Sequence, residues 1–181
     1  MYGYKERKAA QVAAFFALKA GGRINVLKLA KLLYLTERES MERFDEPMFF
    51  DRLVSMEHGP VTSISLNHVN GLLESPHWEE FISGRTDNDI RLVEGQSLDR
   101  FDQLSRSDLA ILNSLWEKFG SYDRFELRDW THDNCPEWVN PQGSSKPIPH
   151  DIIFKFLEKK NAEQLAEDVV GYRTISNALQ A

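Results

Sequence analysis

The sequence predicts a mainly α fold: a single compact helical domain with a small antiparallel β-hairpin. Several segments place apolar residues at the three- and four-residue spacing of a helix, whereas a single segment has the short runs and polar turn of a hairpin. The chain has 181 residues, of which 41% are hydrophobic and 28% are charged, so it can bury one substantial core. We therefore expect residues 1–181 to form one domain.

Two helices are expected in the N-terminal quarter of the chain. Residues 5–19 carry apolar side chains at helical spacing, and Gly21 follows as a stop. Asn25 is a good N-cap for a second helix over residues 26–44, which has apolar residues on more than one side. Such a helix is expected to lie centrally. Pro47 then ends the helical pattern, and a short strand or an extended connection is expected after it.

The tripeptide His58-Gly59-Pro60 is interpreted as a structural corner. Gly59 permits an unusual backbone angle, and Pro60 suits the first position of a helix that reaches about Glu74. His58 is expected to fix the corner by hydrogen bonding, so that its replacement would lower stability. Residues 78–93 are the predicted β-hairpin, because two short apolar runs flank the polar turn TDND.

Helices are also expected to fill the C-terminal half of the chain. Ser105 and Asp108 have the spacing of a capping box at the start of a strongly amphipathic helix. Asp123 can cap a shorter helix, which Pro136 must end. After a loop, two further helices are predicted within residues 149–181.

Composition and charge restrict the location and the partners of the protein. The single cysteine, Cys135, rules out an internal disulfide and fits a reducing compartment, so we expect a cytoplasmic protein. No segment approaches the roughly 18 apolar residues of a membrane helix, and no membrane partner is expected. The net charge is −6, although residues 1–31 hold seven Lys or Arg against one Glu. We interpret this basic start as a solvated helix surface, with a basic face for an acidic partner as the alternative.

The sequence contains no complete catalytic or metal-binding motif. His132 and Cys135 have H-x-x-C spacing, but zinc normally takes four ligands and no second pair stands out, so neither a metal nor a cofactor is expected. A hydrolase or transferase that uses Cys135, with His132 or His150 as its base, is the alternative. No oxyanion loop stands beside this cysteine and Pro136 follows at once, so an inert thiol is favoured.

A DNA-binding regulator is the second alternative function. The basic N-terminal helices favour DNA binding, but the chain as a whole is acidic, so nucleic acid is not an expected partner.

Two tryptophans, Trp130 and Trp138, flank the segment THDNCPE. We interpret both side chains as packing the helix end and the loop, and the alternative is that they form an aromatic surface for binding a partner.

Two segments of the chain carry a family resemblance. The first contains LKLAKLLY, from Leu27 to Tyr34, followed by Pro47 and by the HGPV of His58 to Val61. The second is FELRDWTHDNCPEW, in which the matching residues are Leu127, Thr131, His132, Pro136 and Trp138. Together they resemble the Panacea-domain antitoxin family, which includes SocA-like and GepA-like proteins. The resemblance covers residues 25–138, and the chain departs from the pattern at Glu137 and in an insert around Asp87.

The resemblance implies a mostly helical domain that neutralises a toxin by direct protein contact, without enzymatic activity. The expected partner is then a cognate toxin, and a phage or mobile-element association is implied. One branch of the family also delivers its toxin to a bacterial protease, which would make a protease adaptor role a further expectation. We expect the contact surface on the basic N-terminal helix or near the family motifs. The residues predicted for partner binding or for the family motif are Lys31, Tyr34, His58, Gly59, Pro60, Trp130, His132, Pro136 and Trp138.

Overall fold

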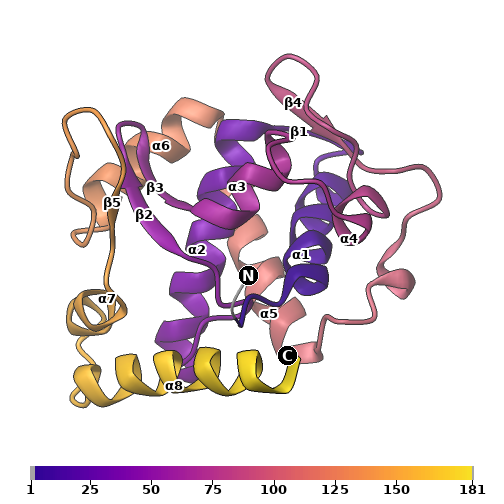
Figure 1. Cartoon of the computed structure of the whole chain (residues 1–181). Coiled ribbons are helices and arrows are strands. Elements are labelled where there is room, and N and C mark those ends of the chain that lie inside the picture. Colours follow the sequence, from indigo (N-terminus) through magenta and orange to yellow (C-terminus); the bar gives the residue numbers. More distant parts are fainter. Residues whose placement is uncertain (1–2, 181) are drawn as a thin grey trace.

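The structure, a computed structural model that describes residues 3–180, is mainly helical with small antiparallel sheets, as the sequence predicts (Figure 1). The helices are α1 (Glu6–Lys19), α2 (Val26–Phe44), α3 (Ser63–Val69), α4 (Pro76–Glu79), α5 (Arg106–Phe119), α6 (Arg124–Asn134), α7 (His150–Phe156) and α8 (Ala162–Gln180). The strands are β1 (Arg23–Asn25), β2 (Leu53–Met56), β3 (Gly59–Thr62), β4 (Asp89–Arg91) and β5 (Lys146–Pro147). A short 3-10 turn covers Leu98–Arg100.

Helix α2 lies at the centre of the molecule, as its all-round apolar pattern predicts. It contacts α1, α3, α5, α6 and α7 as well as β1 and β3 (Figure 1). Leu29, Leu32, Leu33 and Tyr34 on this helix have no exposed surface. A helix that is apolar on several sides gains stability only when other elements surround it, and that requirement places α2 in the core.

Side-chain caps define the starts of three helices where the sequence predicts them. The side chain of Asn25 accepts a hydrogen bond from Leu27 N at 3.0 Å at the start of α2. Ser105 and Asp108 form the predicted capping box of α5. Asp123 caps α6 in the same manner, with Glu126 as its reciprocal partner. Each cap satisfies backbone N–H groups that would otherwise lack a partner at a helix start.

The predicted helix start at Pro60 is wrong, because Pro60 lies in strand β3 and α3 begins only at Ser63. Strand β3 is an edge of the three-stranded sheet β3-β2-β5, where the missing N–H of a proline is tolerated. The start of α3 is fixed from a distance. The carboxylate of Asp51 accepts hydrogen bonds from Ile64 N and Ser65 N, both at 2.8 Å. A cap that lies so far upstream leaves no local signal in the sequence.

The predicted β-hairpin over residues 78–93 is present in an irregular form, and the structure also has a regular hairpin, β2–β3, that the sequence did not predict. In this hairpin Met56 pairs with Gly59 across a turn formed by Glu57 and His58. Within residues 78–93, α4 ends at Glu79, and β4 additionally pairs in antiparallel fashion with β1. The two expected runs are connected by the antiparallel bridges Ile82 to Leu92 and Thr86 to Asp89. Backbone hydrogen bonds from Ser83 N to Arg91 O and from Val93 N to Phe81 O, both at 2.9 Å, join them as well. The partner of β4 is remote in sequence, so the local pattern could not reveal it.

The predicted C-terminal helices are present as α7 and α8, which pack against each other at the base of Figure 1. Helix α8 is anchored to the preceding fold by two contacts. The ring of Tyr172 stacks on Phe50 with centroids 4.1 Å apart, and Arg173 donates to the carbonyl groups of Phe50 and Asp51. None of the helices in residues 3–180 combines the length and the apolar character of a membrane span.

Candidate functional site

Several family-motif residues meet where the β2–β3 hairpin crosses α2 and the end of α6. We call this contact the hairpin junction and define it by Lys31, Gly59, Pro60, His132 and Trp138. Lys31 is fully buried, and its Nζ donates a hydrogen bond to the carbonyl oxygen of Pro60 at 3.0 Å. This bond ties the central helix to the hairpin. Residues that are far apart in the sequence are thereby brought together.

Gly59 is required at the junction for two independent reasons. Its φ angle is +100°, in the region that side chains other than glycine rarely adopt. A Cβ atom at this position would also lie 2.8 Å from Lys31 Nζ and 3.1 Å from the ring of His132. The interpretation of Gly59 as a residue that allows an unusual angle and a close approach therefore agrees with the structure.

Two aromatic rings, of His132 near the end of α6 and of Trp138 just beyond it, contact the other side of the hairpin. His132 stacks on Trp138 with centroids 4.1 Å apart and an angle of 4° between the planes. The indole Nε1 of Trp138 donates to the carbonyl oxygen of Met56 at 2.9 Å. Burial, together with the nearby charges of Lys31 and Arg128, lowers the pKa of His132. A neutral imidazole stacked on an indole is a packing group, so we assign His132 to the architecture of the junction.

Two further groups at the junction have strongly shifted pKa values, and burial is the main cause in both. Burial lowers the pKa of Lys31 to about 7. Burial raises the pKa of Cys135 to about 12, and the neighbouring Glu137 adds to this rise. The thiol of Cys135 is completely buried and therefore remains protonated at neutral pH. These properties oppose the hypothesis of a Cys135 nucleophile.

Glu137, which sequence reasoning treated only as a departure from the family pattern, holds the chain after α6 against α2. Its Oε1 accepts hydrogen bonds from Tyr34 OH at 2.6 Å and from Arg38 Nε at 2.8 Å. Glu137 is only 4% exposed, so the ion pair is largely shielded from water. The spacing of Tyr34 and Arg38, one helical turn apart, was the available signal for a shared partner. Tyr34 thus has a structural role beside the junction.

The remaining predicted site residues lie outside the junction. His58 is exposed at the hairpin turn, and its side chain makes no hydrogen bond to a residue within 3–180 that the structure describes. The expectation that His58 fixes the corner by hydrogen bonding is therefore wrong. Pro136 is exposed just beyond the end of α6. Trp130 packs on Phe119 with centroids 4.7 Å apart, which confirms that it packs within the fold.

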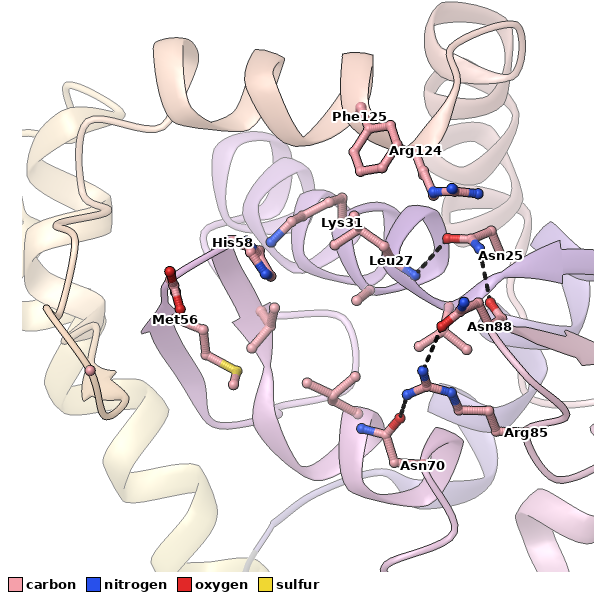
Figure 2. Close-up of a pocket in the computed structure, with 16 residues that line it drawn as sticks. Asn25, Leu27, Lys31, Met56, His58, Asn70, Arg85, Asn88, Arg124 and Phe125 are labelled. Carbon is pink, nitrogen blue, oxygen red and sulfur yellow. Dashed lines mark hydrogen bonds between the residues drawn. The ribbon is translucent and has the colours of Figure 1, made fainter.

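A pocket of about 580 Å³ opens beside the hairpin junction (Figure 2). Helix α2, the hairpin, α3, the insert and the start of α6 all contribute to it. Its apolar wall consists of Val26, Leu27, Ala30, Val61 and Leu66. Figure 2 shows Phe125 and Arg124 on one side of the pocket and Asn70 and Arg85 on the opposite side. This volume falls in the range of small-ligand pockets, roughly 300–1,000 Å³.

The rim of this pocket carries exposed apolar and cationic side chains. Phe125 and Met56 are exposed to 45% and 38%. The guanidinium of Arg124 lies 4.6 Å from the centre of the Phe125 ring. Arg85 is held in place by hydrogen bonds to the side-chain oxygens of Asn70 and Asn88. The sequence pattern did not identify Phe125, Arg124 or Arg85, because the elements that carry them meet only in the fold.

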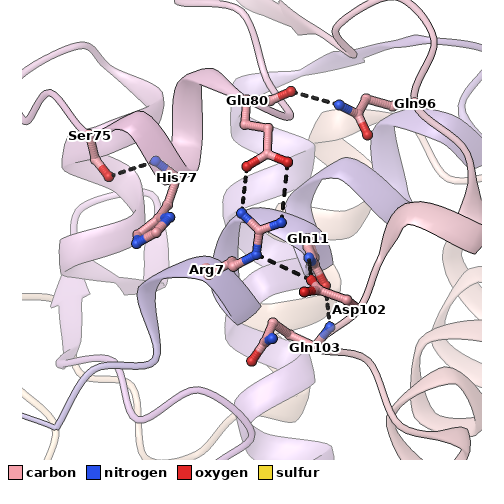
Figure 3. A network of polar contacts seen from close by, with 8 residues as sticks. All are labelled: Arg7, Gln11, Ser75, His77, Glu80, Gln96, Asp102 and Gln103. Carbon is pink, nitrogen blue, oxygen red and sulfur yellow. Dashed lines mark hydrogen bonds and ion pairs between the residues drawn. The ribbon is translucent and has the colours of Figure 1, made fainter.

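The basic N-terminal helix, the other predicted contact surface, pairs two of its charges with carboxylates of the same chain; Figure 3 shows the contacts of Arg7. Arg7 forms ion pairs with Glu80 at 2.5 Å and with Asp102 at 3.2 Å. Lys8 forms an ion pair with Asp108 at 2.8 Å. These contacts connect α1 to α5 and to the segments that flank the insert. Two of the three basic residues of α1 are thus paired within the fold, whereas Lys19 at its end is exposed.

The possible metal ligands of the sequence do not assemble. Among residues 3–180, no group of three or more His, Cys, Asp or Glu side chains has an arrangement that could hold a metal ion. The H-x-x-C pair of His132 and Cys135 is instead part of the packing around α6: the ring of His132 stacks on Trp138, and Cys135 is buried.

The fold and the junction together define a mainly α domain in which motif residues hold a β-hairpin against a central helix. Residues 29–139 match the family model of the SocA-like antitoxins with a Panacea domain, and the chain belongs to this family. The matched region extends from the second turn of α2 to just beyond Trp138, so it includes the whole junction and most of the pocket lining. Comparisons with curated proteins and with solved structures give no match.

Proposed function

We propose that this protein is an antitoxin that neutralises a cognate toxin by direct, stoichiometric binding and catalyses no reaction. The observation that carries the proposal is membership of the SocA-like Panacea family over residues 29–139. The burial of Cys135, with its raised pKa, removes the nucleophile of the alternative hydrolase or transferase. The protein acts in the cytoplasm, where a single thiol stays reduced.

The toxin contacts the face that contains the pocket and its rim. This face combines a recessed apolar wall with the exposed side chains of Phe125 and Met56. Protein interfaces concentrate their binding energy on such apolar anchors, while polar groups at the rim set orientation and association rate. Binding there covers the functional surface of the toxin, and the hairpin junction keeps the receiving face rigid.

The decisive experiment is co-expression with the product of the neighbouring gene. We expect that product to stop growth alone, to be harmless together with this protein, and to co-purify with it at a one-to-one ratio. A neighbouring product that is harmless alone would remove the main support for the proposal. Restored growth without a complex would contradict neutralisation by binding.

A pair of exposed phenylalanines tests where the toxin binds. Phe125 at the pocket rim and Phe156 on α7 are exposed to 45% and 48%, so they lose similar exposed area on replacement by alanine. We expect Phe125→Ala to weaken neutralisation and Phe156→Ala to leave it unchanged. Equal effects of the two substitutions would place the contact elsewhere.

A further inference from the structure

The charge of the pocket is opposite in sign to that of the whole chain. The exposed charged residues that line the pocket are Arg85 and Arg124 on the basic side and Glu57 on the acidic side, and the buried Lys31 adds a partial positive charge at neutral pH because burial lowers its pKa to about 7. The chain as a whole carries a net charge of −6. A local excess of positive charge in an acidic protein attracts acidic groups selectively to that place.

The backbone adds to this positive potential. Helices α2 and α6 both begin at the pocket, since Val26 and Leu27 of the first and Arg124 and Phe125 of the second line it. The N-terminal end of a helix carries a partial positive charge. The nearby carboxylate of Asp123 accepts hydrogen bonds from Phe125 N and Glu126 N, so it offsets part of the positive charge at the N-terminal end of α6.

Two arginines at the rim retain donors that a carboxylate can use. Arg124 is exposed, and it forms no ion pair with any residue that the structure describes between 3 and 180. Arg85 uses three N–H groups, toward Asp87 O, Asn70 Oδ1 and Asn88 Oδ1. A guanidinium has five N–H donors, so two remain on Arg85, which its amide partners hold in a fixed orientation. Lys31 differs, because it is buried and bound to Pro60 O.

We propose that the pocket binds an acidic segment of the partner that carries an apolar anchor: a large apolar side chain enters against the α2 wall, and an adjacent carboxylate pairs with Arg124 or Arg85. This inference rests on the proposed function, since it names the chemistry of the toxin segment. The apolar wall explains the anchor, and the rim arginines explain the carboxylate. A basic segment would be repelled, and a purely apolar one would leave the rim charges without partners.

The probe is a phage-displayed library of random peptides, selected on the full-length protein. We expect enriched peptides to place Asp or Glu next to Phe, Trp, Leu, Ile or Met. Their affinity should fall as the salt concentration rises, because ion pairs at an exposed rim are screened. Enrichment of Lys- or Arg-rich peptides, of uncharged apolar peptides, or of no peptide at all would overturn the proposal.

Two matched arginines provide the control. Arg124 and Arg106 are both exposed first residues of helices that begin with a capping box, so charge reversal changes the same local environment. We expect Arg124→Glu to weaken the selected peptides about tenfold or more and Arg106→Glu to leave them unchanged. Both variants should unfold at the temperature of the wild-type protein. Equal binding by the two variants would contradict the proposal.

Co-expression separates this inference from the proposed function. If the wild-type protein rescues growth and Arg124→Glu rescues it equally well, the pocket assignment fails while the antitoxin function stands. If the wild-type protein does not rescue growth, the antitoxin function fails. The peptide selection still decides the chemistry of the pocket in that case, because it requires no toxin.

Discussion

The cations of α1 and the cations of the pocket rim resemble each other in sequence but differ in the fold. Arg7 and Lys8 form ion pairs with carboxylates that lie on other elements. Arg85 and Arg124 are exposed beside an apolar wall. The same residue types thus stabilise the molecule in one region and are available to a partner in the other. Available charge, rather than the density of charge along the chain, indicates a binding surface.

The sequence alone does not show which cations are paired, because the paired residues lie far apart along the chain. Arg7 meets Glu80, which is 73 residues away, so no local pattern shows that its charge is compensated. The pocket rim is likewise assembled from the insert and from the start of α6. A count of basic residues over the first 31 positions therefore does not show which of these charges are already paired within the fold.

The largest effect is expected for Gly59→Ala, which removes the rigid support of the pocket side. The new Cβ must adopt a φ near +100° and must displace Lys31 Nζ or the His132 ring. Backbone strain and overpacking together should lower the free energy of unfolding by about 2–4 kcal/mol. Chemical denaturation measures this loss. Gly84→Ala is the control, because Gly84 has open space around it, and an equal loss there would contradict the argument.

A third kind of cation, the buried Lys31, should make stability depend on pH. Its pKa in the fold is about 7, below the ordinary value of 10.5, so the unfolded chain binds the extra proton between these values. Stability from this group is therefore complete above about pH 10.5 and is lost as the pH falls toward 7. The slope should approach about 1.4 kcal/mol per pH unit within this range.

Lys31→Met isolates this contribution, since it keeps an apolar stem and removes the amine. The nearby titratable or charged groups, Cys135, His132 and Arg128, remain in both proteins. The difference in unfolding free energy between the wild-type protein and the variant should change in favour of the wild-type protein from pH 7 to pH 10. A constant difference over this range would show that Lys31 keeps its proton inside the fold.

The sequence predicted most of the helices, because their signals are local. The caps at Asn25, Ser105 and Asp123 and the apolar faces behind them are readable within a few residues. The β2–β3 hairpin was missed because Pro60 suits a helix start as well as an edge strand. The start of α3 was missed because Asp51 caps it from outside the helix.

Part of the candidate site could likewise be predicted from the sequence, and part could not. The family resemblance identified the residues of the hairpin junction, such as Lys31 and Trp138, although it did not reveal their contacts. The pocket rim remained hidden, because Arg85 and Arg124 have no distinctive local pattern. The family-motif residues and the pocket-rim residues are therefore largely separate sets, and only the fold brings them side by side.

A matched pair of substitutions tests the difference between paired and open cations directly. Lys8 forms an ion pair with Asp108 in which the side chains are 17% and 11% exposed. Lys8→Met should lower the free energy of unfolding by about 1 kcal/mol, because the partly buried Asp108 loses its partner. Arg124→Met should change it by less than about 0.5 kcal/mol. Thermal unfolding of both variants measures the contrast, and equal losses would show that the rim arginine is also structural.

The smallest effect on stability is expected for His58→Ala, although His58 directly precedes Gly59. The imidazole is exposed at the hairpin turn, whereas the backbone of Gly59 faces the buried Lys31. Removal of an exposed side chain without hydrogen bonds should change the free energy of unfolding by less than about 0.5 kcal/mol. A loss above about 1 kcal/mol would show that His58 does hold the corner. Because His58 also lines the pocket, weaker neutralisation at unchanged stability would extend the contact surface to the tip of the hairpin.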